Sequence, residues 1–403
     1  MTKKTVFVGL SGGVDSSVAA ALLKQEGYKV VGVYMKNWSK DLPGFPCPWK
    51  EDFQDAKRVA IQLGIDFKMY DFETQYRQKV VDYMLDEYKA GRTPNPDIMC
   101  NQEVKFKLFL DTALDDGADF IATGHYARIK NGQLFTGLDE NKDQSYFLYR
   151  VTEKALQKSL MPIGEYKKPE IRELAKKLGL TTADKKDSQG ICFVGKVGIK
   201  EFLEQYVRAK PGKIIDHNGK IIGEHDGAIF YTLGQRHGLN LGGGLPYYVT
   251  GKNMAKNEVM VTTDLNDKEL WSKELRLTDV HWINDKPDTI KKYQVRVRYR
   301  APLVPANLKI LDRSSLLDLR KAPPSPDQLI SSGSGLSSFD VAKATSPSVK
   351  PLSTPTDLPW ERAILGKSSL LLILEESVRA VTPGQSTVIY DESNRVVGGG
   401  IIV

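Results

Sequence analysis

Cysteine is scarce in this 403-residue sequence, which contains Cys47, Cys100 and Cys192 and no C-x-x-C pair. A structural zinc site takes about four ligands and a disulfide scaffold takes many cysteines, so the sequence argues against both. No apolar run is long enough to cross a membrane, and no signal peptide or Arg-rich leader precedes the first strand pattern. These absences predict a cytoplasmic protein without a membrane partner. Its cysteines are expected to be reduced, with disulfides forming only transiently in catalysis.

A strong charge of either sign is also absent, because 57 basic residues are set against 50 acidic ones and the net charge is +7. This small excess permits a polyanionic partner without requiring one. The hydrophobic content of 41% is sufficient for packed cores, and the length predicts two or three domains.

Strand and helix patterns alternate through the first two hundred residues, which predicts an α/β domain with a parallel sheet covered on both faces. The expected strands are residues 5–10, 28–35, 65–72 and 119–123. The expected helices are residues 14–27, 51–64, 76–90 and 103–117.

The pattern changes near residue 205 to short strands around an Asn218-Gly219 turn, and from about residue 270 it is mostly β. We therefore expect a catalytic domain over 1–205, a small central β-rich domain over 206–270 and a C-terminal β-barrel over 271–403. A segment at about 312–359 is rich in serine and proline and has no apolar periodicity. It is expected to be a disordered insertion in the barrel.

The stretch "GLSGGVDSS", residues 9–17, joins the first expected strand to the first expected helix. Gly12 and Gly13 let the backbone approach an anion, and the amides at the helix start attract negative charge. Serine hydroxyls add donors, and Asp15 suits a Mg²⁺ ion that bridges it to phosphates. The stretch is neither a P-loop nor G-x-G-x-x-G, so it predicts another kind of phosphate site. A plain tight turn is the alternative.

Two of the cysteines lie in stretches that favour chemistry. Cys100 follows Asp97 in "TPNPDIMCNQEVKF", at the expected start of the 103–117 helix, where a thiolate is stabilised and Asp97 is near enough to act as acid or base. Cys192 lies in "KKDSQGICFVG", where lysines favour a thiolate. Because both stretches resemble polar loops, reactive cysteines are preferred over buried structural ones. Cys47, between prolines, has no acid–base partner nearby.

The stretch "YQVRVRYR", residues 293–300, alternates strictly and places Arg296, Arg298 and Arg300 on one face of an expected strand. Three arginines in a row suit a phosphate backbone. A solvated face of the barrel is the alternative.

"SGGVDSS" resembles the loop of the PP-loop ATPases (adenine nucleotide alpha hydrolase-like), which cleave ATP between the α and β phosphates. Taken with "MKNW", "NPDIMCN", "TGHYAR", "LDENKDQSYFLY", "KKDSQGICFVG", "TLGQRHGL" and "VTPGQSTVIY", it makes the chain similar to the tRNA-specific 2-thiouridylase family. The resemblance runs from residue 5 to about 310 and resumes near 375, and the serine/proline segment departs from the family pattern.

This resemblance implies an enzyme, a tRNA-uridine 2-sulfurtransferase that uses ATP and Mg²⁺. It would adenylate the C2 carbonyl of the wobble uridine and transfer persulfide sulfur, giving 2-thiouridine, AMP and pyrophosphate. The implied partners are tRNA and a cysteine desulfurase or sulfur-relay protein. Sulfur would reach the base directly from Cys192 or as sulfide released by Cys100, and either route leaves a Cys100–Cys192 disulfide.

The resemblance also implies the role of individual residues. Cys192 is similar to the persulfide carrier, Cys100 to the nucleophile and Asp97 to the acid/base. The expected ATP contacts are Gly9, Leu10, Ser11, Gly12, Gly13, Val14, Asp15, Ser16, Met35 and Gly124. The expected tRNA contacts are Asn95, Pro96, Asp97, His125, Lys142, Asp143, Gln144, Arg298, Tyr299 and Gln385. From the residues alone, a polar turn is the preferred interpretation of 142–144, and His125 could either approach RNA or simply satisfy a hydrogen bond.

Three other functions fit parts of the sequence. A PP-loop ligase or amidotransferase such as argininosuccinate synthase needs no paired cysteines, and the chain shows no glutaminase pattern. A non-catalytic tRNA-binding protein would retain the loop but make no AMP. Three thiolates are also enough to ligate an iron–sulfur cluster with an open iron position.

Overall fold

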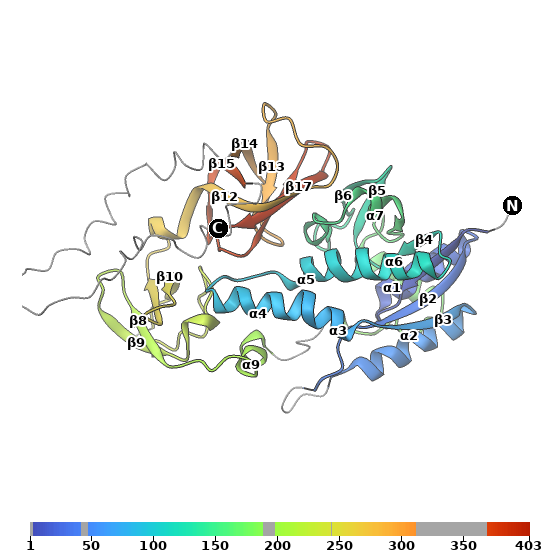
Figure 1. The fold of residues 1–403 in the computed structure, drawn as a ribbon, viewed down its shortest axis with the longest axis horizontal. Helices are drawn as coiled ribbons and strands as arrows, with labels where there is room; N and C mark the ends of the chain where they lie inside the picture. The colour runs from blue at the N-terminus through green and yellow to red at the C-terminus, as the bar shows by residue number, and fades with distance from the viewer. Residues whose placement is uncertain (1–2, 42–46, 188–197, 243, 312–368) are drawn as a thin grey trace, which may run out of the picture.

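The computed structural model of the chain describes residues 3–41, 47–187, 198–242, 244–311 and 369–403. Cys192 and the serine/proline segment expected at about 312–359 lie outside the described residues. Figure 1 shows the parallel sheet and the barrel as separate bodies, with the helices labelled α4 to α6 running between them.

A parallel sheet forms the N-terminal unit, with strand order β3-β2-β1-β4-β7. Its strands are β1 (Thr5–Gly9), β2 (Lys29–Lys36), β3 (Asp66–Asp71), β4 (Phe120–Ala122) and β7 (Ser159–Leu160). The predicted α/β fold with a parallel sheet is therefore confirmed, and the expected strands lie within a residue or two of the observed ones.

Helices cover both faces of this sheet, because successive residues of β1 point to opposite sides. Val6 and Val8 pack with α1 and α2, whereas Phe7 packs with the helices of the other face. The first face carries α1 (Val14–Gln25), α2 (Trp49–Leu63) and α8 (Lys168–Lys177). The second carries α3 (Glu73–Tyr76), the π-helical η1 (Arg77–Val81), α4 (Asp82–Lys89), α5 (Pro96–Met99), the π-helical η2 (Cys100–Leu108) and α6 (Phe109–Asp115).

The helix expected at 103–117 starts earlier than predicted. α5, η2 and α6 follow one another without a break, so the helix begins at Pro96. Asn95 caps it, because the Asn95 Oδ1 accepts a hydrogen bond from the Asp97 amide at 3.1 Å, and proline is favoured at the first helical position. Cys100 is therefore in the second turn of a helix and not in a loop before it.

A small four-stranded sheet follows, with order β10-β11-β8-β9. Its strands are β8 (Gly212–Ile215), β9 (Ile221–His225), β10 (Tyr248–Asn253) and β11 (Glu258–Thr262). β8 and β9 form the hairpin predicted around Asn218-Gly219, and Gly219 has a φ of +80° there. The short helices nearby are α9 (Ile199–Glu204) and the 3-10 turns η4 (Ala228–Phe230) and η5 (Lys268–Leu270).

The C-terminal strands close into a barrel, because β12 pairs with both β15 and β17 at the ends of the order β12-β15-β14-β13-β16-β17. The strands are β12 (Trp271–Trp282), β13 (Tyr293–Arg296), β14 (Val304–Leu311), β15 (Ser369–Arg379), β16 (Ser386–Tyr390) and β17 (Arg395–Ile402). The predicted barrel is confirmed. β13 ends at Arg296, so the expected strand over 293–300 is only half as long as predicted.

A hairpin from the N-terminal unit joins the barrel sheet. β5 (Ala127–Lys130) and β6 (Gln133–Thr136) pair with each other, and β6 pairs with β17 through Phe135–Arg395 and Leu134–Val396. The 3-10 turn η3 (Ser145–Leu148) and α7 (Glu153–Gln157) follow this hairpin. The predicted division at residues 205 and 270 stays a prediction, since the barrel sheet draws strands from both ends of the chain.

Candidate functional site

The glycine-rich loop lies where β1 ends and α1 begins. Gly12 has a φ of +75°, and a Cβ there would lie 2.5 Å from the Asp52 carbonyl oxygen, so only glycine fits. Gly13 precedes α1 with no side-chain cap, so the first amides of the helix have no side-chain acceptor at the cap. The loop therefore presents backbone N–H groups and a helix dipole, the features that bind phosphate.

The serines of this loop differ in their hydrogen bonds and exposure. The Ser16 and Ser17 hydroxyls donate to the Gly13 carbonyl at 3.1 and 2.8 Å, and both residues are buried. The Ser11 amide donates to the Ser16 hydroxyl at 3.2 Å. Ser16 and Ser17 thus fix the shape of the loop, and Ser11 is the exposed hydroxyl.

Met35 and Gly124, two of the predicted ATP contacts, lie against the loop, and a nucleotide role for them stays a prediction. A Cβ on Gly9 would come within 2.9 Å of the Met35 Cε, at the end of β2. A Cβ on Gly124 would come within 2.7 Å of the Ser16 amide nitrogen. The chain after β4 therefore approaches the phosphate loop more closely than any residue with a side chain allows.

Asp15 is the carboxylate of the loop, and the structure surrounds it with donors that the sequence did not indicate. Its oxygens accept from the Lys168 Nζ at 2.7 and 2.9 Å and from the Tyr126 hydroxyl at 2.7 Å. Burial and the Asp15 charge raise the pKa of Tyr126, so its hydroxyl remains a donor. Lys168 opens α8, more than 150 residues away in sequence, and no local pattern links it to the loop.

Asp187 extends this network. It accepts from Lys142 and Arg172, each at 2.6 Å, and pairs with Lys168 at 2.9 Å. Partial burial acts in the opposite direction, but the hydrogen bonds from Lys142 and Lys168 lower the pKa of Asp187 to about 2. Two carboxylates and three basic side chains therefore form one ion-pair network at the loop.

The donor set at Asp15 fits a magnesium ion. Mg²⁺ takes oxygen ligands and is commonly held by one or two carboxylates together with substrate phosphates. Asp15 is in the first turn of α1, directly after the amides of the loop, and its side chain is 32% exposed. Here the Lys168 ammonium pairs with the Asp15 carboxylate. If the carboxylate bound a cation instead, the same ammonium would be available to a phosphate oxygen.

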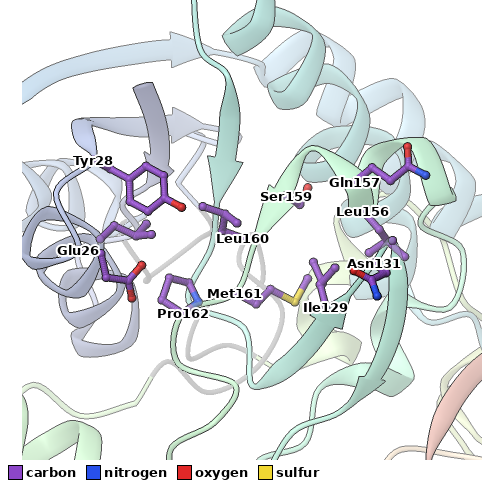
Figure 2. A pocket seen from close by; sticks show the side chains of 12 residues that line it. Glu26, Tyr28, Ile129, Asn131, Leu156, Gln157, Ser159, Leu160, Met161 and Pro162 are labelled. Atoms are coloured by element: carbon purple, nitrogen blue, oxygen red, sulfur yellow. The ribbon is translucent and has the colours of Figure 1, made fainter. Parts of the chain in front are cut away.

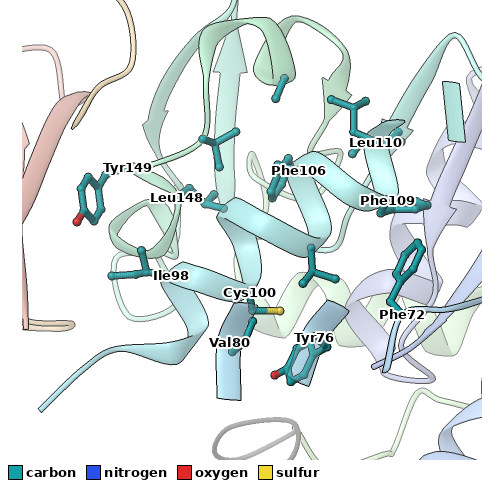
Figure 3. Packing of buried hydrophobic residues seen from close by; sticks show 14 of the residues in the cluster. Phe72, Tyr76, Val80, Ile98, Cys100, Phe106, Phe109, Leu110, Leu148 and Tyr149 are labelled. Atoms are coloured by element: carbon teal, nitrogen blue, oxygen red, sulfur yellow. The ribbon is translucent and has the colours of Figure 1, made fainter. Parts of the chain in front are cut away.

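The second half of the site is the helix of Asp97 and Cys100. Cys100 is only 3% exposed and lies in the large apolar cluster, near Tyr76 and Val80 (Figure 3). The prediction that it lies in a polar loop is wrong, because the Asn95 cap starts the helix before it and turns it inward. Asp97, three residues earlier, is half-buried and on a neighbouring position of the same helix face.

Two groups beside Asp97 set the electrostatics. Burial raises the pKa of Asp97, and the charge of Lys105 acts in the opposite direction. His125 is buried; burial first, and then Lys105, hold its pKa well below 6.5, so the imidazole is neutral. The His125 Nδ1 contacts the Thr123 hydroxyl at 2.8 Å, and the Lys105 Nζ lies 3.5 Å from the His125 Nε2.

Gly124 and His125 join the two halves, since one residue touches the phosphate loop and the next touches Lys105 of the Cys100 helix. The phosphate loop and Lys105 of the Cys100 helix are therefore linked through two consecutive residues that follow β4, at the carboxyl edge of the sheet. This edge is where ligands bind to open parallel sheets.

The expected tRNA contacts at 142–144 have partners within the protein. Asp143 is 3% exposed and pairs with Arg296 at 2.9 Å, and it accepts from the Gly137 amide at 3.0 Å. The Gln144 side chain accepts from the Tyr126 amide at 3.0 Å. The polar-turn interpretation describes this geometry, and an RNA role for these residues stays a prediction.

The arginine face predicted over 293–300 is not continuous. Arg296 points inward to Asp143, whereas Arg298 and Arg300 are exposed in the turn after β13. Arg300 lies in this turn with a φ of +62°. Tyr299 packs on Phe147 with ring centroids 4.5 Å apart.

Gln385 contacts the chain just before the Cys100 helix. Its Nε2 donates to the Thr93 carbonyl at 2.7 Å, and the Thr93 amide donates to the Pro383 carbonyl at 2.9 Å. The Thr93 hydroxyl also lies 3.2 Å from that of Thr232 in the central unit. The barrel and the central unit therefore both hold the segment that leads to Asn95 and Pro96.

A pocket of about 600 Å³ lies elsewhere (Figure 2). It is lined from the end of α1, from β5 and from β7, including Tyr28, Ile129 and Met161. α1 separates it from the phosphate loop by the length of the helix, about 18 Å at 1.5 Å per residue. It is therefore not part of the candidate site.

Within the described ranges, no helix is long and apolar enough to span a bilayer.

Three family models match consecutive parts of the chain. A model described as a tRNA methyl transferase HUP domain matches residues 4–196, and a tRNA methyl transferase PRC-barrel domain matches 200–263. An aminomethyltransferase beta-barrel domain matches 272–321 and 349–402, which leaves a gap inside the serine/proline segment.

Curated relatives match nearly the whole chain. A protein named tRNA-specific 2-thiouridylase MnmA from Bacillus subtilis is 42% identical, over 98% of this chain and 94% of its own length. One of the same name from Bacillus cytotoxicus is 45% identical with the same coverage. A tRNA-specific 2-thiouridylase MnmA 2 from Geobacillus kaustophilus is 49% identical over 74% of this chain and 82% of its length. The domain descriptions name a methyl group and the relatives name sulfur, and the relatives carry more weight because they span all the matched domains.

Proposed function

Because the chain belongs to the tRNA-specific 2-thiouridylase family, we propose that it thiolates the wobble uridine of tRNA by ATP-dependent adenylation of C2 and transfer of persulfide sulfur. It is an enzyme of tRNA uridine thiolation. The observation that supports the two-step chemistry most directly is the junction of the phosphate loop and the Cys100 helix through Gly124 and His125. Activation and sulfur transfer must act on the same carbon atom, so the ATP-binding loop and the cysteines must both be able to reach the C2 atom of the uridine.

The first step would use the loop of residues 9–16. Its amides and the α1 dipole would hold the β and γ phosphates, and Lys168 and a Mg²⁺ ion on Asp15 would offset their charge. The uridine O2 attacks the α phosphorus, the bond to the β phosphate breaks, and pyrophosphate leaves. Fixed donors of this kind stabilise charge that develops on the leaving group.

The second step would use the cysteines. The outer sulfur of a Cys192 persulfide attacks C2, the C–O bond breaks, and AMP leaves with the electron pair. The Cys100 thiolate then attacks the inner sulfur of Cys192, the S–S bond to the base breaks, and the base keeps one sulfur at C2. The two cysteines are left as a disulfide, which an external dithiol reduces. Asp97 would accept the Cys100 proton before this attack.

The test is a reaction with purified protein, an unmodified tRNA transcript, labelled ATP and glutathione persulfide. We expect tRNA-dependent AMP, and digestion should give 2-thiouridine by mass spectrometry. Cys100→Ser and Cys192→Ser should each abolish thiolation while tRNA affinity stays within about twofold, and Cys47→Ser is the matched control with near-normal activity.

Each other outcome points to a different function. AMP without thiolated nucleoside would favour a PP-loop ligase, and tRNA binding without AMP would favour a binding protein. Activity of Cys192→Ser with the persulfide donor would remove its carrier role. A cysteine desulfurase or relay protein as donor, and a cytoplasmic location, are parts of the same proposal.

A further inference from the structure

Lys168, the first residue of α8, is held at both its backbone and its ammonium group. Its amide donates to the Asp139 carboxylate at 2.8 Å. Its Nζ donates to the two oxygens of Asp15 at 2.7 and 2.9 Å and pairs with Asp187 at 2.9 Å, so these contacts engage all the protons of the ammonium. The side chain is only 10% exposed. The ammonium is therefore a fixed part of the phosphate loop, and it can reach a new partner only by giving up one of these contacts.

The Asp15 carboxylate is occupied in this arrangement. Its Oδ1 accepts from both Lys168 and the Tyr126 hydroxyl, each at 2.7 Å. A metal ion at Asp15 would share the carboxylate with the ammonium, and two cations so close together repel each other. Mg²⁺ also gives up its hydration water reluctantly. Asp15 with Lys168 in place is therefore a poor site for a metal ion that arrives alone.

The second carboxylate of the network does not depend on Lys168. Asp187 pairs with Lys142 and with Arg172, each at 2.6 Å, in addition to the ammonium. Asp15, in contrast, has Lys168 as its one ion-pair partner among the described residues. Lys168 can therefore change partners while Asp187 remains paired, and the carboxylate that is freed by the change is that of Asp15.

A pyrophosphate group in the loop would cause this change. It would bring negative charge to the amides at the start of α1, and Asp15 is in the first turn of that helix. Phosphate oxygens accept strong hydrogen bonds from an ammonium, whereas a carboxylate beside them is repelled unless a cation lies between the two. Both conditions are met when Lys168 contacts phosphate and Asp15 binds Mg²⁺, whose usual ligands are carboxylate and phosphate oxygens.

We propose that Lys168 makes metal binding depend on phosphate, because its ammonium occupies Asp15 until a pyrophosphate group in the loop takes the ammonium and leaves Asp15 to Mg²⁺. The inference deepens the ATP-binding step of the proposed function and rests on it. Linked binding is reciprocal, so the metal raises the affinity for the phosphates by the same factor. The loop therefore binds the nucleotide tightly only together with its metal ion.

The experiment measures binding and not catalysis. Full-length protein is dialysed to equilibrium against Mn²⁺, with and without α,β-methylene-ATP and in the absence of tRNA, and the Mn²⁺ retained per chain is counted. Mn²⁺ prefers the same oxygen ligands as Mg²⁺, and the methylene group prevents cleavage between the α and β phosphates. The wild type is compared with Lys168→Met and Lys142→Met. Lys142 is the matched control, because among the described residues it pairs with Asp187 in the same network and not with Asp15.

The expected result is a gain that is specific to Lys168. The analogue should raise the Mn²⁺ affinity of the wild type by at least about tenfold. In Lys168→Met the Asp15 carboxylate is free from the start, so Mn²⁺ alone should bind about tenfold more tightly than it binds to the wild type. Lys142→Met removes a charge from the same network but leaves Asp15 occupied, and its affinity for Mn²⁺ alone should stay within about twofold of the wild type.

Two results overturn the inference. One is a wild type that binds Mn²⁺ equally well with and without the analogue. The other is an equal gain in Lys168→Met and Lys142→Met, which would mean that the charge of the network matters and the occupation of Asp15 does not. Lys168→Gln is the second variant, and thermal unfolding shows that each variant is folded before its affinity is compared. A wild-type enzyme that forms no 2-thiouridine refutes the proposed function, whereas the dialysis still decides the role of Lys168.

Discussion

At the residue scale, the ion pair of Asp143 and Arg296 couples the N-terminal unit to the barrel. We expect Asp143→Ala to lower the free energy of unfolding by about 3–5 kcal/mol, because it leaves a buried guanidinium without its carboxylate. Urea unfolding measures this loss. Arg298→Ala is the control, since Arg298 is exposed in the next turn and should change stability by less than about 0.5 kcal/mol.

The Asp143→Ala variant also separates two roles for Asp143. If Asp143→Ala unfolds at the wild-type urea concentration but binds tRNA more weakly, the residue contacts RNA as the family resemblance implies. If stability falls and tRNA affinity of the folded fraction is unchanged, the residue is an internal link between units.

At this scale, the candidate residues found from the sequence are those that lie close to one another in the chain. The glycines and Asp15 of the loop, and Asp97 three residues before Cys100, were all visible as local patterns. Lys168 was not, because it comes from a helix more than 150 residues away. Proximity in space between distant parts of the chain is not encoded in a short pattern.

At the element scale, the turn between β15 and β16 positions the chain before the Cys100 helix. Gly384 has a φ of +92°, and a Cβ there would lie 2.8 Å from the Thr93 amide nitrogen. We expect Gly384→Ala to push the turn off Thr93 and to lower thiolation at least severalfold, because Thr93 leads to the Asn95 cap. Initial rates of 2-thiouridine formation measure this.

Gly179→Ala supplies the matched control. Gly179 has a φ of +64° and no atom within 4 Å of the added Cβ. The substitution should therefore lower the free energy of unfolding by only about 1 kcal/mol, the cost of holding alanine in a left-handed backbone conformation. Its activity should be that of the wild type. Equal activity losses in both variants would mean that the effect comes from backbone strain and not from contact with Thr93.

The bounds of helices and strands were predicted well where apolar periodicity is strong. They were predicted poorly where a helix cap or a turn sets the end of the element. β1, α1 and β2 lie close to their expected bounds, since each has a continuous apolar pattern. The Pro96 start was missed because an Asn-Pro cap was read as a loop. β13 was overextended because the chain turns after Arg296, although the alternation of residue types continues to Arg300. The joining of β6 to β17 could not be predicted, since pairing between distant strands leaves no local signal.

At the scale of the whole molecule, the barrel register allows a prediction about the serine/proline segment. Leu311 at the end of β14 pairs directly with Ser369 at the start of β15. A two-residue Asn-Gly turn matches such an antiparallel pair. We therefore expect a chain in which residues 312–368 are replaced by Asn-Gly to fold and to thiolate tRNA within about twofold of the full chain.

Thermal unfolding and initial thiolation rates test this replacement. A chain that keeps its unfolding temperature but loses tRNA affinity would assign the segment to RNA binding. A chain that no longer folds would show that the register of β14 and β15 depends on the segment, against the expectation.

The pairing of β17 also has a consequence for synthesis on the ribosome. Val396 pairs with Leu134, 262 residues earlier in the chain. At about 5–20 residues per second, the β5–β6 hairpin emerges roughly ten to fifty seconds before the strand that covers its edge. The nascent chain thus carries an open strand edge through most of its translation, and edges of this kind recruit other strands. The rate at which the ribosome reaches β17 therefore sets how long each new molecule is open to association with its neighbours on a polysome.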